Sequence, residues 1–146
     1  MPTYPMTFSA SAISPSGLDT SWETTTADNR SIRCSIPQEF GGPNSGYSPE
    51  DLYLLALMNC YIATLKVIAM NSKMTFTSLN ASGTLTLNKV EGAPTPLMKS
   101  AHLKFTAQGV ENRERFQRLM ERVAKQCMII NSVKTDVQFE FEAMSV

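Results

Sequence analysis

Two cysteines are the side chains in this sequence with the clearest capacity for covalent chemistry. Cys60 lies inside an apolar stretch, and Cys127 follows a second run of apolar residues that recur at helical spacing. Taken singly, each is best explained as a small apolar residue of a core, because free cysteines are commonly buried. Taken together, two cysteines on the core-facing sides of two helices can meet if those helices pack together. Such a pair could form a redox-active site.

A redox pair of this kind gives its two thiols different roles. Reaction with a peroxide needs a thiolate, and the sulfenic acid that results is captured by a second thiol as a disulfide. Cys127 is expected near the C-terminus of its helix, where the negative end of the helix dipole opposes thiolate formation. Cys60 is therefore the candidate for attack, and Cys127 is the candidate for resolving the sulfenic acid.

Other residues that could carry chemistry are better explained by structure. Cys34 shares one face of a predicted strand with Ile32 and Ile36, which indicates a buried position. His102 is the single histidine, and it has no other ligands at metal spacing, so it is interpreted as structural and no metal site is predicted. The loop over residues 41–46 lacks the lysine and hydroxyl ending of a P-loop, and a connecting loop is the stronger interpretation.

The apolar pattern predicts the elements that would position these side chains. Ser48 can cap a helix, Pro49 suits its first position, and the helix should run to about Ser72. Its segment over residues 52–58 is apolar all round, which indicates burial on nearly every side. Further elements are predicted as two or three strands within 1–38, a hairpin over 81–90 and 97–110, an amphipathic helix from 111 and a strand over 136–144.

The order of these elements indicates the fold class. The strands occur in runs bounded by helices, without regular alternation of strand and helix. That order is typical of an α+β protein with antiparallel sheets packed on helices. The chain has 146 residues, the usual size of one domain, so a single domain over 1–146 is predicted.

Composition and charge limit the partners and the compartment. With 13 basic and 13 acidic residues the formal net charge is zero, so neither a nucleic acid nor a membrane is predicted as a partner. Residues 1–12 lack the basic start and apolar run of a secretory signal. The apolar stretch from Leu52 to Ala63 is too short to span a bilayer. Three cysteines without an export signal indicate reduced thiols, and a cytoplasmic location is expected.

Three short motifs occur in an order that resembles the OsmC/Ohr family, the osmotically inducible and organic hydroperoxide resistance proteins. In that family a glycine loop leads into a Pro-Glu helix start, the first cysteine lies on that helix, and a later helix ends with the second cysteine. Cys127 falls at that second position, and the resemblance covers about residues 37–146. The motifs are Glu39-Phe40-Gly41-Gly42-Pro43, Ser48-Pro49-Glu50-Asp51-Leu52 and Leu57-Met58-Asn59-Cys60-Tyr61.

The resemblance implies a fold and an activity. Antiparallel sheets would wrap a long, buried central helix, and two chains would form an intertwined homodimer. The protein would be a thiol-dependent peroxidase of organic hydroperoxides or hydrogen peroxide, needing no metal, flavin or haem. Cys60 would be peroxidatic, Cys127 resolving, and Glu50 part of the activating network, with a small dithiol or a thioredoxin-like protein as reductant. Without the resemblance, Glu50 would be interpreted as a solvated acid at a helix N-terminus.

Helix geometry supports a dimer independently of the resemblance. Ten residues of helix separate Glu50 from Cys60 by about 15 Å along the axis, so the two cannot touch within one chain. If two copies of the helix cross antiparallel about a two-fold axis near Leu55 and Ala56, Glu50 of one chain approaches Cys60 of the other. A helix that is apolar all round fits such a buried crossing.

The sequence also departs from the family pattern. Active hydroperoxide resistance enzymes of the family use an arginine upstream of the glycine loop, whereas the only cations here before that loop are Arg30 and Arg33, in a predicted strand. Residues 128–130 follow Cys127 where a proline and a small polar residue are common. Two alternatives therefore stand beside the peroxidase: a catalytically weak member that binds a hydrophobic small molecule at the dimer interface, and a structural or interaction protein with core cysteines.

Overall fold

The computed structural model describes residues 2–146. Contacts within the chain divide it into two compact units, of which the first runs to Leu52 and the second is Tyr53–Val146. The first unit carries one sheet, and the second carries another sheet together with most of the helical residues. The observed class is α+β, as predicted.

The first unit contains three short strands, in agreement with the two or three that the sequence predicts. They form an antiparallel sheet in chain order, and a single turn of helix, η1, follows them. This turn ends at Gly41, whose φ of 82° is in the left-handed region that glycine adopts readily. The elements are β1 (Ala10–Ile13), β2 (Trp22–Thr26), β3 (Ser31–Cys34) and η1 (Gln38–Phe40).

The glycine loop returns the chain alongside β3. The Tyr47 amide donates a hydrogen bond to the Arg33 carbonyl at 2.9 Å, and the Ser35 amide donates one to the Tyr47 carbonyl at 3.0 Å. A Cβ added at Gly46 would lie 2.6 Å from the Arg33 carbonyl oxygen, so this close return requires glycine. The loop thus connects β3 and η1 to the residues that precede the long helix.

The long helix α1 (Pro49–Asn71) begins where the sequence predicts. The Ser48 hydroxyl accepts a hydrogen bond from the Asp51 amide at 2.9 Å, and the Asp51 carboxylate accepts one from the Ser48 amide at 3.0 Å. This reciprocal arrangement satisfies two backbone donors that the helix start would otherwise leave unpaired. Pro49 follows the cap at the first helical position, where its missing N–H costs nothing.

Helix α1 is less buried within one chain than the sequence predicts. Its fully buried residues are Leu57, Tyr61, Leu65 and Ala69, which recur every four residues and define one face. Residues on the other faces, such as Val67, are half-buried or exposed. The expectation of burial on nearly every side is thus wrong for a single chain, because one sheet and one helix can cover only one face of α1.

The apolar character of α1 also bears on a membrane. The predicted apolar stretch of 52–63 is short, but the whole helix has 23 residues and contains an 18-residue window of mean hydropathy 1.7. By length and composition alone it could therefore cross a bilayer, and 22% of that window is buried within the chain. One such helix is weak support for a membrane span, because the core helix of a globular protein has the same length and composition.

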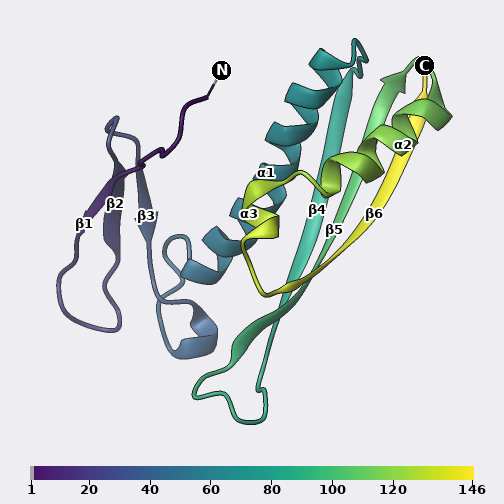
Figure 1. Cartoon of the computed structure of the whole chain (residues 1–146). Helices are drawn as coiled ribbons and strands as arrows, with labels where there is room; N and C mark the ends of the chain where they lie inside the picture. Colours follow the sequence, from purple (N-terminus) through teal and green to yellow (C-terminus); the bar gives the residue numbers. More distant parts are fainter. Residues whose placement is uncertain (1) are drawn as a thin grey trace. The chain divides into compact units, whose positions relative to one another are not determined.

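The second unit contains a three-stranded sheet in the order β4-β5-β6, and α1 and α2 lie on one face of it (Figure 1). Strands β4 and β5 are antiparallel, as the predicted hairpin requires, whereas β5 and β6 are parallel. The expectation of purely antiparallel sheets is therefore wrong for β6. The reason is the helical crossover between β5 and β6, which returns the chain to the end at which β5 starts. The elements are β4 (Ser78–Asn88), β5 (Leu97–Val110), α2 (Arg113–Ala124), α3 (Met128–Asn131) and β6 (Asp136–Ser145).

One core joins α1, α2 and the sheet. Alternate residues of β5 point inward because strand side chains alternate between faces, and the buried face of α2 repeats at helical spacing. Tyr61 of α1 lies at the centre, with its ring stacked on Phe105 and Phe141 at centroid distances of 4.0 and 5.3 Å. The core residues around Tyr61 are Leu57, Leu65, Ala101, Leu103, Phe105, Ala107, Phe116, Leu119, Met120 and Val123.

Candidate functional site

The structure brings Cys60 and Cys127 together. Cys60 lies midway along α1 and is half-buried, whereas Cys127 is completely buried in the same core. Cys60 packs against the core that contains Cys127, and it lies near enough to raise the pKa of the Cys127 thiol. Neither cysteine forms a disulfide. The second unit therefore holds the predicted pair of adjacent thiols, one partly accessible and one enclosed.

The position of Cys127 in its element differs from the prediction. Helix α2 ends at Ala124, and Cys127 is the residue that precedes the single-turn helix α3. Its φ of −82° and ψ of 112° are extended, so the residue is not helical. The apolar spacing continued through Cys127 because the side chain does face the core. The sequence pattern therefore detected the burial and missed the end of the helix.

Backbone groups surround both sulfur atoms. The Ile129 amide in α3 donates a hydrogen bond to Cys60 Sγ at 3.4 Å, and Cys127 Sγ donates one to the Val123 carbonyl at 3.4 Å. An N–H aimed at sulfur favours the thiolate form of that sulfur, because it stabilises negative charge. A thiol that donates to a carbonyl is held in the protonated form. The two sulfur atoms thus differ in their hydrogen bonds: Cys60 Sγ accepts one, and Cys127 Sγ donates one.

Thr64 is a site residue that sequence reasoning missed. It lies one turn after Cys60 on α1, and its hydroxyl donates a hydrogen bond to the Cys60 carbonyl at 2.7 Å. The same hydroxyl lowers the pKa of Cys127. A threonine four residues from a helical cysteine is the signal that could have identified it, because residues at this spacing share a helix face.

Burial raises the pKa of the Cys127 thiol from an ordinary value of 9.0 to about 11. Removal from water is the largest cause, since a thiolate loses hydration in the core. The Thr64 hydroxyl acts in the opposite direction, and the Cys60 thiol raises the pKa further by charge and by hydrogen bonding. Cys127 is therefore protonated at neutral pH, which fits the predicted resolving role. The sequence analysis attributed this role to the helix dipole, whereas the main cause of the raised pKa is burial.

We expect alkylation of Cys127 to require unusually high pH. In a Cys60→Ser variant, the iodoacetamide rate at Cys127 should rise toward a midpoint above the ordinary 9.0 and below 11, because burial remains while the contributions of Cys60 are lost and only the thiolate reacts. The folded state also holds this proton more tightly than the unfolded state does. The free energy of unfolding should therefore decrease as pH rises from the unfolded pKa toward 11. Peptide mapping by mass spectrometry measures the rate, and a plateau below pH 9 would contradict the assignment.

Glu50 and the upstream arginines belong to the first unit. Glu50 is half-buried in the first turn of α1. Arg30 makes an exposed salt bridge with Asp28 at 2.9 Å, which supports a solvated surface role. Arg33 lies exposed in β3 and makes no salt bridge within residues 2–146. The predicted involvement of Glu50 in the site stays a prediction.

The remaining candidates occupy structural positions. Cys34 is buried at the end of β3, with its sulfur 3.7 Å from the Thr24 hydroxyl. His102 lies exposed on β5, with its Nε2 atom 3.6 Å from a Glu140 carboxylate oxygen. In the described part of the chain, no three His, Cys, Asp or Glu side chains are grouped as metal ligands.

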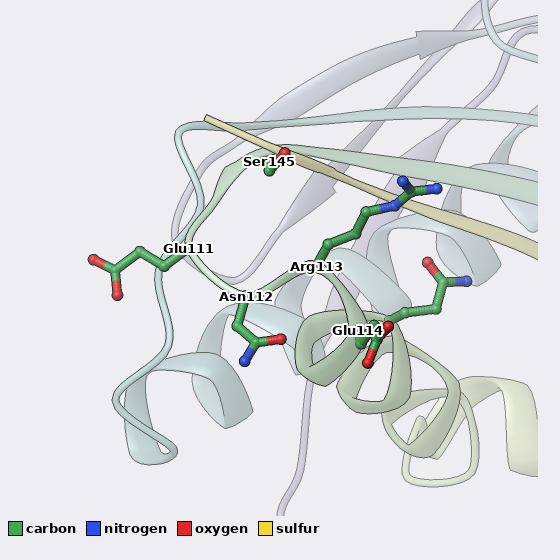
Figure 2. Close-up of a pocket in the computed structure, with 6 residues that line it drawn as sticks. Glu111, Asn112, Arg113, Glu114 and Ser145 are labelled. Atoms are coloured by element: carbon green, nitrogen blue, oxygen red, sulfur yellow. The ribbon is translucent and has the colours of Figure 1, made fainter.

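A polar cavity lies at the start of α2, beside the end of β6 (Figure 2). In Figure 2 Glu111 points away from the helix, whereas Arg113 extends toward β6. Oppositely charged groups line this cavity, and neither member of the thiol pair does. Its lining residues are Glu111, Asn112, Arg113, Glu114, Gln117 and Ser145.

Comparison with known proteins places this architecture in a family. The model of the family described as "OsmC-like protein" matches residues 42–142. The uncharacterized protein YmaD of Bacillus subtilis (strain 168) is 28% identical over 114 residues, which cover 75% of each chain.

Two solved structures are similar in fold. An organic hydroperoxide resistance protein OsmC from Legionella pneumophila has a TM-score of 0.74 at 18% identity, over 99% of this chain and all of that one. The organic hydroperoxide resistance protein OhrB of Bacillus subtilis has a TM-score of 0.65 at 19% identity, over 94% of this chain and 98% of that one. At these identities the likeness is one of fold.

Proposed function

The chain belongs to the OsmC-like protein family, and on that premise we propose that it is a thiol-dependent peroxidase that reduces organic hydroperoxides or hydrogen peroxide through Cys60 and Cys127. The observation that carries the proposal is the proximity of a half-buried thiol and a fully buried one at the same core, where Cys60 raises the pKa of Cys127. Fold relatives named for organic hydroperoxide resistance support the choice of substrate.

Cys60 is the peroxidatic residue in this proposal. Its thiolate attacks the outer oxygen of the peroxide, the O–O bond breaks, and an alcohol leaves with a proton while Cys60 becomes a sulfenic acid. The Ile129 N–H on Cys60 Sγ supports this role, since it stabilises the attacking thiolate. Partial exposure of Cys60 leaves a path for the peroxide, which the enclosed Cys127 lacks.

Cys127 resolves the sulfenic acid. Its sulfur bonds to Cys60 Sγ, the hydroxyl of the sulfenic acid leaves as water, and a disulfide remains. Conversion of Cys60 to the uncharged sulfenic acid removes the charge repulsion that helps to raise the pKa of Cys127. Cys127 therefore becomes easier to deprotonate when it is needed. A dithiol reductant, either a small molecule or a thioredoxin-like protein, then restores both thiols.

An intertwined homodimer in the cytoplasm completes the proposal. Large apolar side chains are exposed in the second unit, including Val67 (54%) and Met70 (71%) on α1 and Met128 (71%) at the start of α3. A second copy that covered these residues would remove apolar surface from water. Two antiparallel α1 helices would also bring Glu50 of one chain toward Cys60 of the other, in one OsmC-like domain per chain.

A stoichiometric oxidation tests the proposed function. Reduced protein mixed with one equivalent of cumene hydroperoxide should rapidly lose two thiols, and mass spectrometry should find a disulfide between Cys60 and Cys127. The alcohol product should appear in equal amount. Thiols that stay reduced while the protein is folded would overturn the peroxidase proposal.

Glu50→Gln should slow the peroxide reaction without unfolding the dimer. The amide has nearly the same size as the carboxylate but lacks its charge, so a network that orients or activates the thiol should lose about tenfold or more in rate. Stopped-flow thiol loss measures the rate, and gel filtration checks the oligomeric state. Glu39→Gln is a matched control on an exposed acid in η1. An unchanged rate for Glu50→Gln would remove Glu50 from the mechanism.

A second candidate function is binding of a hydrophobic small molecule. A cavity of the second unit has mainly apolar walls at the start of β5, with Tyr53 and Thr135 hydrogen-bonded to each other at 2.6 Å beside it. Inert thiols together with a copurified apolar ligand, detected by native mass spectrometry, would favour this candidate. The lining residues are Tyr53, Val90, Leu97, Met98, Lys99, Lys134 and Thr135.

A further inference from the structure

The hydroxyl of Thr64 lies beside the thiol pair. Thr64 is half-buried one helical turn after Cys60 on α1, and its hydroxyl donates a hydrogen bond to the Cys60 carbonyl at 2.7 Å. Residues four apart on a helix lie on the same face, and Cys60 packs against the core that contains Cys127. The hydroxyl is also near enough to Cys127 to lower the pKa of its thiol. The Thr64 hydroxyl is therefore a neighbour of both cysteines.

The backbone of α1 does not depend on the hydrogen bond from Thr64. Within a continuous α-helix, the Cys60 carbonyl already accepts the amide hydrogen of the residue four positions later. A carbonyl oxygen can accept two hydrogen bonds, whereas a hydroxyl donates only one. If the hydroxyl hydrogen turned to another acceptor, the Cys60 carbonyl would keep its helical partner. The hydroxyl can therefore leave this carbonyl at little cost to the helix.

Cys127 needs a hydrogen-bond donor when it reacts. Its sulfur donates to the Val123 carbonyl at 3.4 Å, and loss of the thiol proton ends that donation. The sulfur is then negatively charged in a completely buried position. A buried charge without a donor is strongly unfavourable. Rotation about one C–O bond of the neighbouring Thr64 would direct its hydrogen at this sulfur.

We propose that Thr64 activates Cys127 in the resolving step, because its hydroxyl turns from the Cys60 carbonyl to the Cys127 sulfur as that sulfur becomes a thiolate. The proposal rests on the proposed function, since it assigns a further residue to the same reaction. The Cys127 sulfur forms the S–S bond to Cys60, the S–O bond of the sulfenic acid breaks, and the departing hydroxide takes up the proton that Cys127 lost. Thr64 keeps its own hydrogen throughout.

The two steps then use different donors. The Ile129 N–H acts on Cys60 in the attack on the peroxide, and the Thr64 hydroxyl acts on Cys127 in the attack on the sulfenic acid. Loss of the hydroxyl should therefore slow the second step and leave the first unchanged. A slower second step leaves the sulfenic acid open to further oxidation by excess peroxide for longer.

Three substitutions separate the hydroxyl from the shape of the side chain. Thr64→Val keeps the branched shape and removes the hydroxyl, whereas Thr64→Ser keeps the hydroxyl. Thr77→Val is the matched control, because the Thr77 hydroxyl also donates to a backbone carbonyl of the second unit, that of Gln108 at 3.0 Å. Each protein is mixed with excess cumene hydroperoxide, and the sulfenic acid, disulfide and sulfinic acid are quantified over time by mass spectrometry.

We expect Thr64→Val to form the disulfide about tenfold or more slowly than the wild type, which is the effect of one hydrogen bond to a charged group. Its first oxidation should keep the wild-type rate, and more of its Cys60 should end as sulfinic acid. Thr64→Ser and Thr77→Val should behave as the wild type does.

A second measurement needs no peroxide. In the Cys60→Ser background, adding Thr64→Val should lower the iodoacetamide rate at Cys127 about tenfold at pH 8. The difference should close at pH values at which Cys127 is fully ionised, because only the thiolate reacts. A purely structural role of Thr64 would instead change the rate by the same factor at every pH. Thr64→Ser in this background should keep the rate of Cys60→Ser alone.

Three results would overturn the role of Thr64. They are a wild-type rate of disulfide formation in Thr64→Val, an equal loss of that rate in Thr64→Ser, and an alkylation rate at pH 8 that is the same with and without the hydroxyl. Thiols that are inert to peroxide would overturn the proposed function. The alkylation rates alone would then decide whether Thr64 activates Cys127.

Discussion

Replacing Cys60 with serine should abolish the reaction with cumene hydroperoxide, with a loss of at least about a thousandfold in rate. The serine hydroxyl is un-ionised at neutral pH, and the Ile129 N–H that now points at sulfur cannot make it a comparable nucleophile. Stopped-flow measurement of peroxide loss gives the rate.

The matched replacement at the second thiol should behave differently. Cys127→Ser should preserve the first oxidation, because Cys60 retains its exposure and the Ile129 N–H. Its product should be a sulfenic acid on Cys60 that excess peroxide converts to the sulfinic acid, since no second thiol lies beside it. Trapping with dimedone and mass spectrometry distinguish these products.

Cys34→Ser is the control for both replacements. Cys34 is buried in the first unit next to Thr24, and the proposal gives it no role in the reaction. Its removal should leave both the oxidation rate and the disulfide unchanged. If the Cys60 and Cys127 variants lost the same amount of rate in the first oxidation by peroxide, the asymmetric roles would be contradicted. The buried Cys127 should act only in the second step, in which the disulfide forms.

Tyr61→Ala should cause the largest loss of stability, at about 3–5 kcal/mol in the free energy of unfolding. The Tyr61 ring is completely buried, stacks on Phe105 and Phe141, and donates a hydrogen bond from its hydroxyl to the Met120 carbonyl at 2.9 Å. Alanine would leave a cavity between α1, α2 and the sheet. Urea unfolding at fixed protein concentration measures the loss, because oligomerisation makes stability depend on concentration.

Two further substitutions separate the contributions of the ring and the hydroxyl. Tyr61→Phe keeps the ring and should cost about 1–3 kcal/mol, because the Met120 carbonyl loses its buried partner. Tyr47→Ala, at a residue that is 47% exposed, should change stability by about 0.5 kcal/mol or less. A Tyr61→Ala variant as stable as the wild type would contradict the central position of this ring.

Tyr61 also connects stability to the site. It follows Cys60 directly on α1, and its hydroxyl bond to Met120 links α1 to α2, the helix that leads to Cys127. Burial raises the pKa of Tyr61, so its hydroxyl stays protonated and donates across the pH range in which the thiols react. Loss of this hydrogen bond should therefore make the distance between the two sulfur atoms more variable. It should also weaken the packing of the core.

The sequence by itself determined the local elements and the identity of the two thiols. Ser48, Pro49 and Asp51 specify the start of α1 through capping chemistry that acts within four residues. Strand alternation and helical spacing depend on which side chains face the core, so the hairpin and α2 were predictable. The order of the three sequence motifs indicated the family, and the match of the family model to residues 42–142 confirms it.

Only the tertiary structure decided how these elements meet. The parallel pairing of β6 with β5 follows from the path of the crossover, which no local pattern encodes. The spacing of apolar residues could not show that α2 ends before Cys127. A buried apolar residue just after a helix continues the same sequence pattern as a buried residue inside the helix. The raised pKa of Cys127, the effect of the Thr64 hydroxyl on that pKa and the Ile129 amide at Cys60 depend on packing between segments distant in sequence.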